Sequence, residues 1–130
     1  MRRILVDTHV VVWALTGSRR LRREAERTLT DPRHELLWSA VVTAELALLG
    51  RLGRLRFEES LPAVIDRAME EWAFRPLPVE HEHALEISNM PLHHRDPFDR
   101  LLVAQALVED VAVISADIRF DEYGVRRLEA

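Results

Sequence analysis

The chain has 130 residues, 48% of them hydrophobic and 31% charged, which is the composition of a single globular domain with a core of its own. It has no cysteine, so disulfides, thiolate metal sites and cysteine nucleophiles are excluded. All 18 basic residues are arginine, and the absence of lysine excludes a phosphate-binding P-loop and the phosphotransfer domains that use a lysine. The formal net charge of −4 is not the basic footprint typical of nucleic-acid-binding proteins. We predict one domain over residues 1–130.

The start of the chain is apolar but does not predict a membrane segment. Asp7 and His9 interrupt the apolar run, and no cleavage site of small residues follows it, as a signal peptide would require. No apolar stretch reaches the length needed to span a bilayer. We therefore expect a cytoplasmic protein that does not act at a membrane.

The first half of the chain predicts two strands and three helices. In chain order they are a buried strand over 3–6, a helix over 9–15, a charged helix over 19–29, a strand over 35–39 and a helix over 41–49. Asp31 and Pro32 end the second helix, and Gly50 is predicted to end the third, just past its last residue.

The second half continues the alternation. It predicts an amphipathic helix over 58–72, an extended segment over 74–79, a helix over 80–88, a helix from 97 to about 109, and strands over 111–115 and 125–128. Asp96 is expected to cap the helix that starts at Pro97. Because strands and helices alternate, we predict an α/β fold with a central parallel sheet and helices on both faces.

Four acidic residues are expected at one edge of this sheet. Asp7 and Asp117 each follow a predicted strand, and the carboxyl ends of parallel strands share an edge. Glu45 lies in the first half of a helix that leaves this edge, and Asp99 lies in the first turn of another. We therefore expect all four carboxylates to converge.

The surroundings of two of these acids are unusual. Glu45 is flanked at helical spacing by apolar residues, and Asp99 has Leu102 and Val103 on its face. Burying an unpaired charge is costly, so such carboxylates need a proton, an arginine or a cation. A set of oxygen ligands favours Mg²⁺ or Mn²⁺ over zinc, and such a cation activates water and neutralises a phosphodiester.

Each acid also has a purely structural interpretation. Asp7 fits a turn, Asp117 fits the cap of a short turn, and Glu45 fits a pair with a buried arginine. Asp99 would sit at the third helical position, where an acid helps to cap the helix and meets its dipole. These alternatives explain single residues, but not the convergence of four.

Four segments resemble the PIN-domain ribonucleases, and specifically the VapC-type toxins of prokaryotic toxin–antitoxin pairs. They are ILVDTHVVVWAL, SAVVTAELALLGRLGRL, HHRDPFDRLLVAQAL and VAVISAD with the closing FDEYGV. The third segment is the most specific, and together they cover nearly the whole chain. The resemblance implies a PIN-like three-layer α/β sandwich. It matches the acids of the family to Asp7, Glu45, Asp99 and Asp117, with Asp96 as a reserve ligand.

The same resemblance implies an activity and partners. The expected activity is Mg²⁺-dependent endonucleolytic cleavage of RNA, with Mn²⁺ able to substitute, through in-line attack by metal-activated water. It leaves 5′-phosphate and 3′-hydroxyl ends. A homodimer and inhibition by a cognate antitoxin, which inserts a segment near the acids, are also implied. A hydroxyl often lies near the metal in this family, and Thr8, Ser39 and Ser115 are candidates.

Several other residues have two interpretations. His9 is a candidate for the same pocket as Asp7, and His93 and His94 are candidates for RNA contacts, with a plain surface role as the alternative. The three tryptophans are interpreted as core or interface residues rather than as base-stacking platforms. Arginine runs over 19–27 and 51–56 fit either an RNA backbone or a solvated face.

Three other functions stay open at this point. One is a PIN nuclease that processes RNA without an antitoxin, and another is a catalytically silent PIN binding module. The third is a metal-dependent phosphatase, although the chain has only four glycines and no phosphate-cradling glycine loop.

Overall fold

The structure is a computed structural model that describes residues 2–91 and 96–130. Within these residues five strands form one sheet, and every adjacent pair is parallel. In spatial order the strands are β3 (Arg75–Leu77), β2 (His34–Ser39), β1 (Arg2–Val6), β4 (Ala112–Ser115) and β5 (Arg127–Glu129). The predicted parallel sheet is therefore confirmed.

Helices fill the connections between the strands. They are α1 (Thr8–Thr16), α2 (Arg23–Thr30), α3 (Ala40–Arg51), α4 (Leu61–Glu71), α5 (His81–Glu86) and α6 (Pro97–Glu109), with 3-10 helices η1 (Ile87–Asn89) and η2 (Ile118–Tyr123). None of the helices in the described ranges combines the length and the apolar character that crossing a membrane requires.

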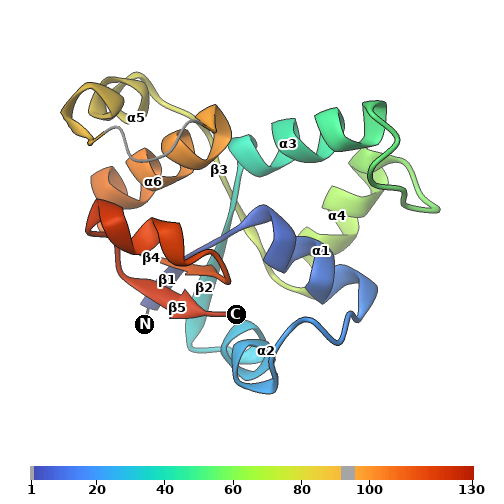
Figure 1. Cartoon of the computed structure of the whole chain (residues 1–130). Coiled ribbons are helices and arrows are strands. Elements are labelled where there is room, and N and C mark those ends of the chain that lie inside the picture. The colour runs from blue at the N-terminus through green and yellow to red at the C-terminus, as the bar shows by residue number, and fades with distance from the viewer. Residues whose placement is uncertain (1, 92–95) are drawn as a thin grey trace.

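The order of the strands places helices on both faces of the sheet. The chain moves outward from β1 to β2 and β3, and then returns past β1 to β4 and β5. Because crossover connections between parallel strands are right-handed, this reversal sends α5 and α6 to the face opposite α1 to α4. Figure 1 shows α5 and α6 on one side of the strands and α1 and α4 on the other. The fold is the three-layer α/β sandwich expected from the sequence.

The core lies along the central strands. Ile4, Leu5 and Val6 of β1 have no exposed surface, and all four residues of β4 are buried. Such continuous apolar strands are typical of a parallel sheet that is covered on both faces. The buried centre fixes the positions of the strand ends, and these ends carry the polar residues described below.

The structure corrects the predicted end of the third helix. Helix α3 runs through Gly50 to Arg51, so the prediction that Gly50 ends it is wrong. Gly53 instead takes the left-handed conformation, at φ 73°. The backbone N–H groups of Gly53 and Arg54 donate to Gly50 O (3.1 Å) and Leu49 O (2.9 Å). This is the Schellman arrangement, in which glycine is favoured after the last helical turn.

Two helices also begin later than predicted. Helix α2 starts at Arg23 rather than at residue 19. Helix α4 starts at Leu61 rather than at residue 58, because the Ser60 side chain accepts a hydrogen bond from the Ala63 backbone N–H and Pro62 stands in the first turn. Neither shift moves a candidate site residue.

Candidate active site

The sheet has a topological switch point between β1 and β4, where the chain leaves two neighbouring strands toward opposite faces. Ligands of open α/β folds bind at the carboxyl ends of the strands at such points. Asp7 directly follows β1, and Ser115 ends β4. The Asp7 backbone N–H donates to Ile114 O at 3.2 Å, which ties the two strand ends together.

A cleft of about 310 Å³ opens at this point. The residues that line it are Asp7, His9, Trp13, Glu45, Asp96, Asp99, Ala116, Asp117 and Arg119. The structure thus brings together in one cleft all four acids that the sequence singled out, and Asp96 with them. The acids come from the ends of β1 and β4, from α3 and from the start of α6.

Asp7 is the most buried of the acids, with 6% of its surface exposed. Its Oδ1 accepts from the Thr8 backbone N–H (2.8 Å), and its Oδ2 accepts from Ser115 Oγ (2.7 Å). Burial raises the pKa of Asp7, while these hydrogen bonds and the positive charge of His9 act in the opposite direction. The hydrogen bonds therefore fix the orientation of the carboxylate, and burial disfavours its ionised form.

Glu45 is held by the residue that also holds Asp7. Thr8 Oγ1 donates to Glu45 Oε1 at 2.6 Å, so Thr8 contacts Asp7 through its backbone and Glu45 through its hydroxyl. Burial raises the pKa of Glu45, and the negative charge of Asp7 adds to this. Thr8, a candidate accessory residue, thus orients two acids.

Asp99 lies where the repulsion among the acids is most evident. Burial is the largest cause that raises its pKa, to about 7, and four neighbouring carboxylates raise it further: those of Asp96, Asp7, Glu45 and Asp117. The ionised form of Asp99 is therefore disfavoured in this cleft.

Asp117 is oriented by two neighbours. Its backbone N–H donates to Ser115 Oγ at 3.0 Å, so Ser115 connects Asp117 to Asp7. Arg119 Nε and Nη2 donate to Asp117 Oδ1 (3.0 Å) and Oδ2 (2.8 Å), as a planar guanidinium can. Sequence reasoning did not single out Arg119. Its position two residues after an acid that caps η2 was the available signal.

The donor set fits a hard divalent cation. Asp7, Glu45, Asp99 and Asp117 offer only oxygen, which suits Mg²⁺ or Mn²⁺. Burial, together with the neighbouring carboxylates, raises the pKa of Asp99, and a bound cation would oppose that rise. The donor types in the cleft therefore match such an ion.

Other candidates behave differently. Asp96 lines the cleft and also caps α6, as predicted, because its Oδ1 accepts from the Phe98 backbone N–H at 2.9 Å. Ser39 is buried away from the cleft lining, where it caps α3 and donates to Gln105 Oε1.

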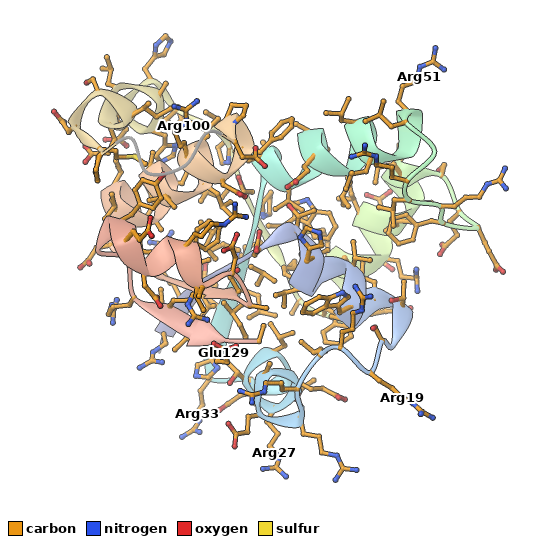
Figure 2. The ribbon with its side chains drawn as sticks, viewed as in Figure 1. Arg19, Arg27, Arg33, Arg51, Arg100 and Glu129 are labelled. Carbon is orange, nitrogen blue, oxygen red and sulfur yellow. The ribbon has the colours of Figure 1, made fainter. Side chains whose placement is uncertain are left out.

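His93 and His94 lie outside the described residues. The arginine runs extend from the surface, and Figure 2 shows Arg19, Arg27 and Arg51 pointing outward.

The tryptophans divide between the core and the cleft. Trp38 is 2% exposed, as a core residue should be. Trp13 packs against the core, as predicted, and it also lines the cleft beside the acids. The signal in the sequence was the spacing of four residues from His9, which places both rings on one helix face.

A second cluster lies at the far end of α6. Among the described residues, the ligand atoms of Glu82, His83 and Glu109 all lie within 4.8 Å of one another. His83 is fully buried, and its Nδ1 accepts from the Glu80 backbone N–H (2.9 Å) while Nε2 donates to Glu109 Oε2 (3.0 Å). Both ring nitrogens are therefore engaged within the protein, so we interpret this cluster as a structural connection between α5 and α6.

Comparison with known proteins identifies the family. The family model described as PIN domain matches residues 4–126, which is nearly the whole chain. The chain belongs to the PIN domain family. No match is found among curated protein sequences.

Solved structures share the fold at low sequence identity. A chain of VapBC2 from Rickettsia felis, bound to a DNA fragment from its promoter, is 13% identical with a TM-score of 0.73, and 98% of each chain is covered. A chain of DNA-bound VapBC from Salmonella typhimurium is 14% identical with a TM-score of 0.68, covering 99% of this chain and 98% of that one. A chain of VapBC-1 from nontypeable Haemophilus influenzae is 17% identical with a TM-score of 0.66, covering 98% and 97%.

Proposed function

We propose that this protein is a Mg²⁺- or Mn²⁺-dependent endoribonuclease. The observation that carries the proposal is the convergence of Asp7, Glu45, Asp99 and Asp117 in one cleft at the switch point, where burial and mutual repulsion raise the pKa of Asp99 to about 7. An acidic cleft of this kind is poorly suited to a phosphodiester unless a cation is present. These four residues would hold the ion.

A divalent cation bound there would activate water and neutralise charge on the phosphodiester. The chain's own residues have the task of holding the ligands. Thr8 fixes Asp7 and Glu45 relative to each other, and Ser115 fixes Asp7 relative to Asp117. Arg119 holds the plane of the Asp117 carboxylate. Such preorganisation reduces the ordering needed when the ion and the RNA bind.

We further propose that the enzyme is the toxin of a toxin–antitoxin pair, acting in the cytoplasm as a homodimer. The support is the resemblance of the sequence segments to VapC-type toxins, together with the shared fold of chains from VapBC assemblies. A cognate antitoxin would then inhibit the enzyme. Co-expression with the product of an adjacent small gene tests this part, since a toxin should form a stable complex with it and lose activity.

Cleavage of a mixed cellular RNA pool with sequencing of the new ends tests the nuclease. Wild type and Asp7→Asn are compared, each with Mg²⁺ and with a chelator. We expect discrete cuts bearing 5′-phosphates in only one of these conditions, wild type with Mg²⁺. Cuts that survive the chelator or the substitution would overturn the mechanism. An absence of cuts with both Mg²⁺ and Mn²⁺ would favour a silent binding module.

A further inference from the structure

We propose that His9 and Trp13 form an aromatic platform in the cleft that stacks a base of single-stranded RNA next to the acidic residues. The proposal rests on the proposed ribonuclease function and adds a binding subsite to it. The two residues lie four apart on α1, and their ring centroids are 6.3 Å apart with the planes tilted by 54°. Both line the cleft that contains the acids.

The exposure of these rings distinguishes them from core aromatics. His9 is exposed and Trp13 is partly exposed. Trp38, by contrast, is buried, packs edge-on against Phe74 at 5.4 Å and donates its indole N–H to Thr43 Oγ1 at 2.9 Å. In the part of the chain that the structure describes, the Trp13 indole N–H has no such acceptor. Aromatic surface on the wall of a polar cleft is therefore available to a ligand.

The charge of the cleft favours stacking as the means of binding there. The carboxylates repel the phosphates of RNA, and Arg119 is already engaged with Asp117. A bound cation and uncharged contacts can both contribute affinity close to the acids. The face of a base is uncharged. Stacking of a base on an aromatic side chain contributes affinity whatever the RNA sequence, because every base has an aromatic face.

The position of His9 joins the platform to the site. His9 follows Asp7 by two residues in the first turn of α1, and it lines the same cleft as Asp7 and Glu45. His9 is thus near two of the proposed metal ligands, so a base on this platform would place its phosphates close to them. A base in a duplex is covered on both faces, whereas an unpaired base can enter the cleft.

Fluorescence and affinity measurements test the platform separately from catalysis. The probe is a short single-stranded RNA that contains a cleavage site found in the pool experiment. It is added to an Asp99→Asn background, in which cleavage should be slower by about 100-fold or more. Trp13→Leu should weaken binding by about tenfold and remove most of the quenching of tryptophan fluorescence. Trp72→Leu is the matched control, because Trp72 is also partly exposed but lies in another cleft, and it should change neither affinity nor the quenching.

Further variants keep the test decisive if Trp13→Leu folds poorly. His9 is exposed, so His9→Ser should fold and weaken binding, while His9→Phe should retain affinity because it keeps a ring without the charge. The matching RNA duplex should bind more weakly than the single strand.

The outcomes separate the two proposals. Wild-type affinity in Trp13→Leu and His9→Ser would overturn the platform and leave the nuclease intact. If these variants instead weakened only the complex with a protein inhibitor, the rings would serve a protein interface and the platform would again be wrong. Absence of cleavage by the wild type with both Mg²⁺ and Mn²⁺ would overturn the proposed function itself.

Discussion

Helix α6 carries an acid near each end, and the protein surrounds the two in opposite ways. Near its start, Asp99 lies among carboxylates, and burial with their repulsion raises its pKa to about 7. At its last residue, about 15 Å away along the axis, Glu109 accepts from His83 Nε2 (3.0 Å) and Arg3 Nη2 (3.5 Å). The hydrogen bond from His83 is the largest cause that lowers the pKa of Glu109.

The helix dipole alone predicts the reverse. An acid is favoured at the positive start of a helix and disfavoured at its negative end. At both ends of α6, the surrounding side chains therefore affect the pKa of the acid more than the helix dipole does. The contrast teaches that His83 stabilises the ionised form of Glu109, which serves the fold, whereas the ionised form of Asp99 is disfavoured, as expected for a residue of the proposed metal site. Four measurements test this contrast.

The largest effect is expected from Asp99→Asn. It should reduce Mg²⁺-dependent cleavage by about 100-fold or more, because a ligand of the proposed ion is lost. It should also remove most of the rise in Tm that Mg²⁺ causes by binding only the folded protein, about 10 °C at saturating ion. Glu109→Gln, at the other end of the same helix, should keep both responses. A full Mg²⁺ response in Asp99→Asn would show that Asp99 is not a ligand.

The second effect concerns the fold. His83→Ala should lower the free energy of unfolding by about 3 kcal/mol, because it empties a fully buried position and leaves the Glu80 N–H without its acceptor. Urea denaturation measures this. The Mg²⁺-induced rise in Tm should persist, and its loss would mean that the two ends of α6 are not independent.

The third effect is the pH dependence of the metal-free protein. The pKa of Asp99 is 3.8 in an unfolded chain and about 7 in the folded protein, so between these values the folded state holds a proton that the unfolded state has lost. The free energy of unfolding in a chelator should therefore fall as pH rises from about 4 to 7. We expect a loss of about 1–2 kcal/mol, since solvent screens a partly exposed group. Urea denaturation at each pH should give a flatter curve for Asp99→Asn; an equally steep one would contradict this explanation.

The smallest effect has the opposite sign in pH. A lowered pKa means that ionised Glu109 stabilises the protein above its unfolded pKa of 4.5, and that this contribution is lost as pH falls through the folded value. Glu109→Gln should thus lower the free energy of unfolding by about 0.5 kcal/mol at pH 7, a small value because solvent still reaches the carboxylate and screens its charge. The difference from wild type should shrink toward pH 3. A difference that grew there would contradict the assigned sign.

The fold was predictable because its signals are local. Runs such as Ile4–Val6 are apolar without interruption, and Pro97 following Asp96 marks a helix start. The convergence of the acids was predictable too, since parallel strands share an edge. The prediction for Gly50 failed because two glycines lie close together, and the hydrogen bonds of the last turn select Gly53.

The sequence by itself determined the α/β alternation, the acids at the strand ends and the family segments, because each depends on neighbours along the chain. Only the tertiary structure decided which side chains complete the cleft. Trp13 lines the cleft as well as packing against the core, Thr8 donates to Glu45, and His83 is buried against Glu109. These contacts join residues of different elements or choose one face of a helix, and local patterns leave that choice open. Burial and repulsion among segments far apart in sequence likewise set the charge state of the site.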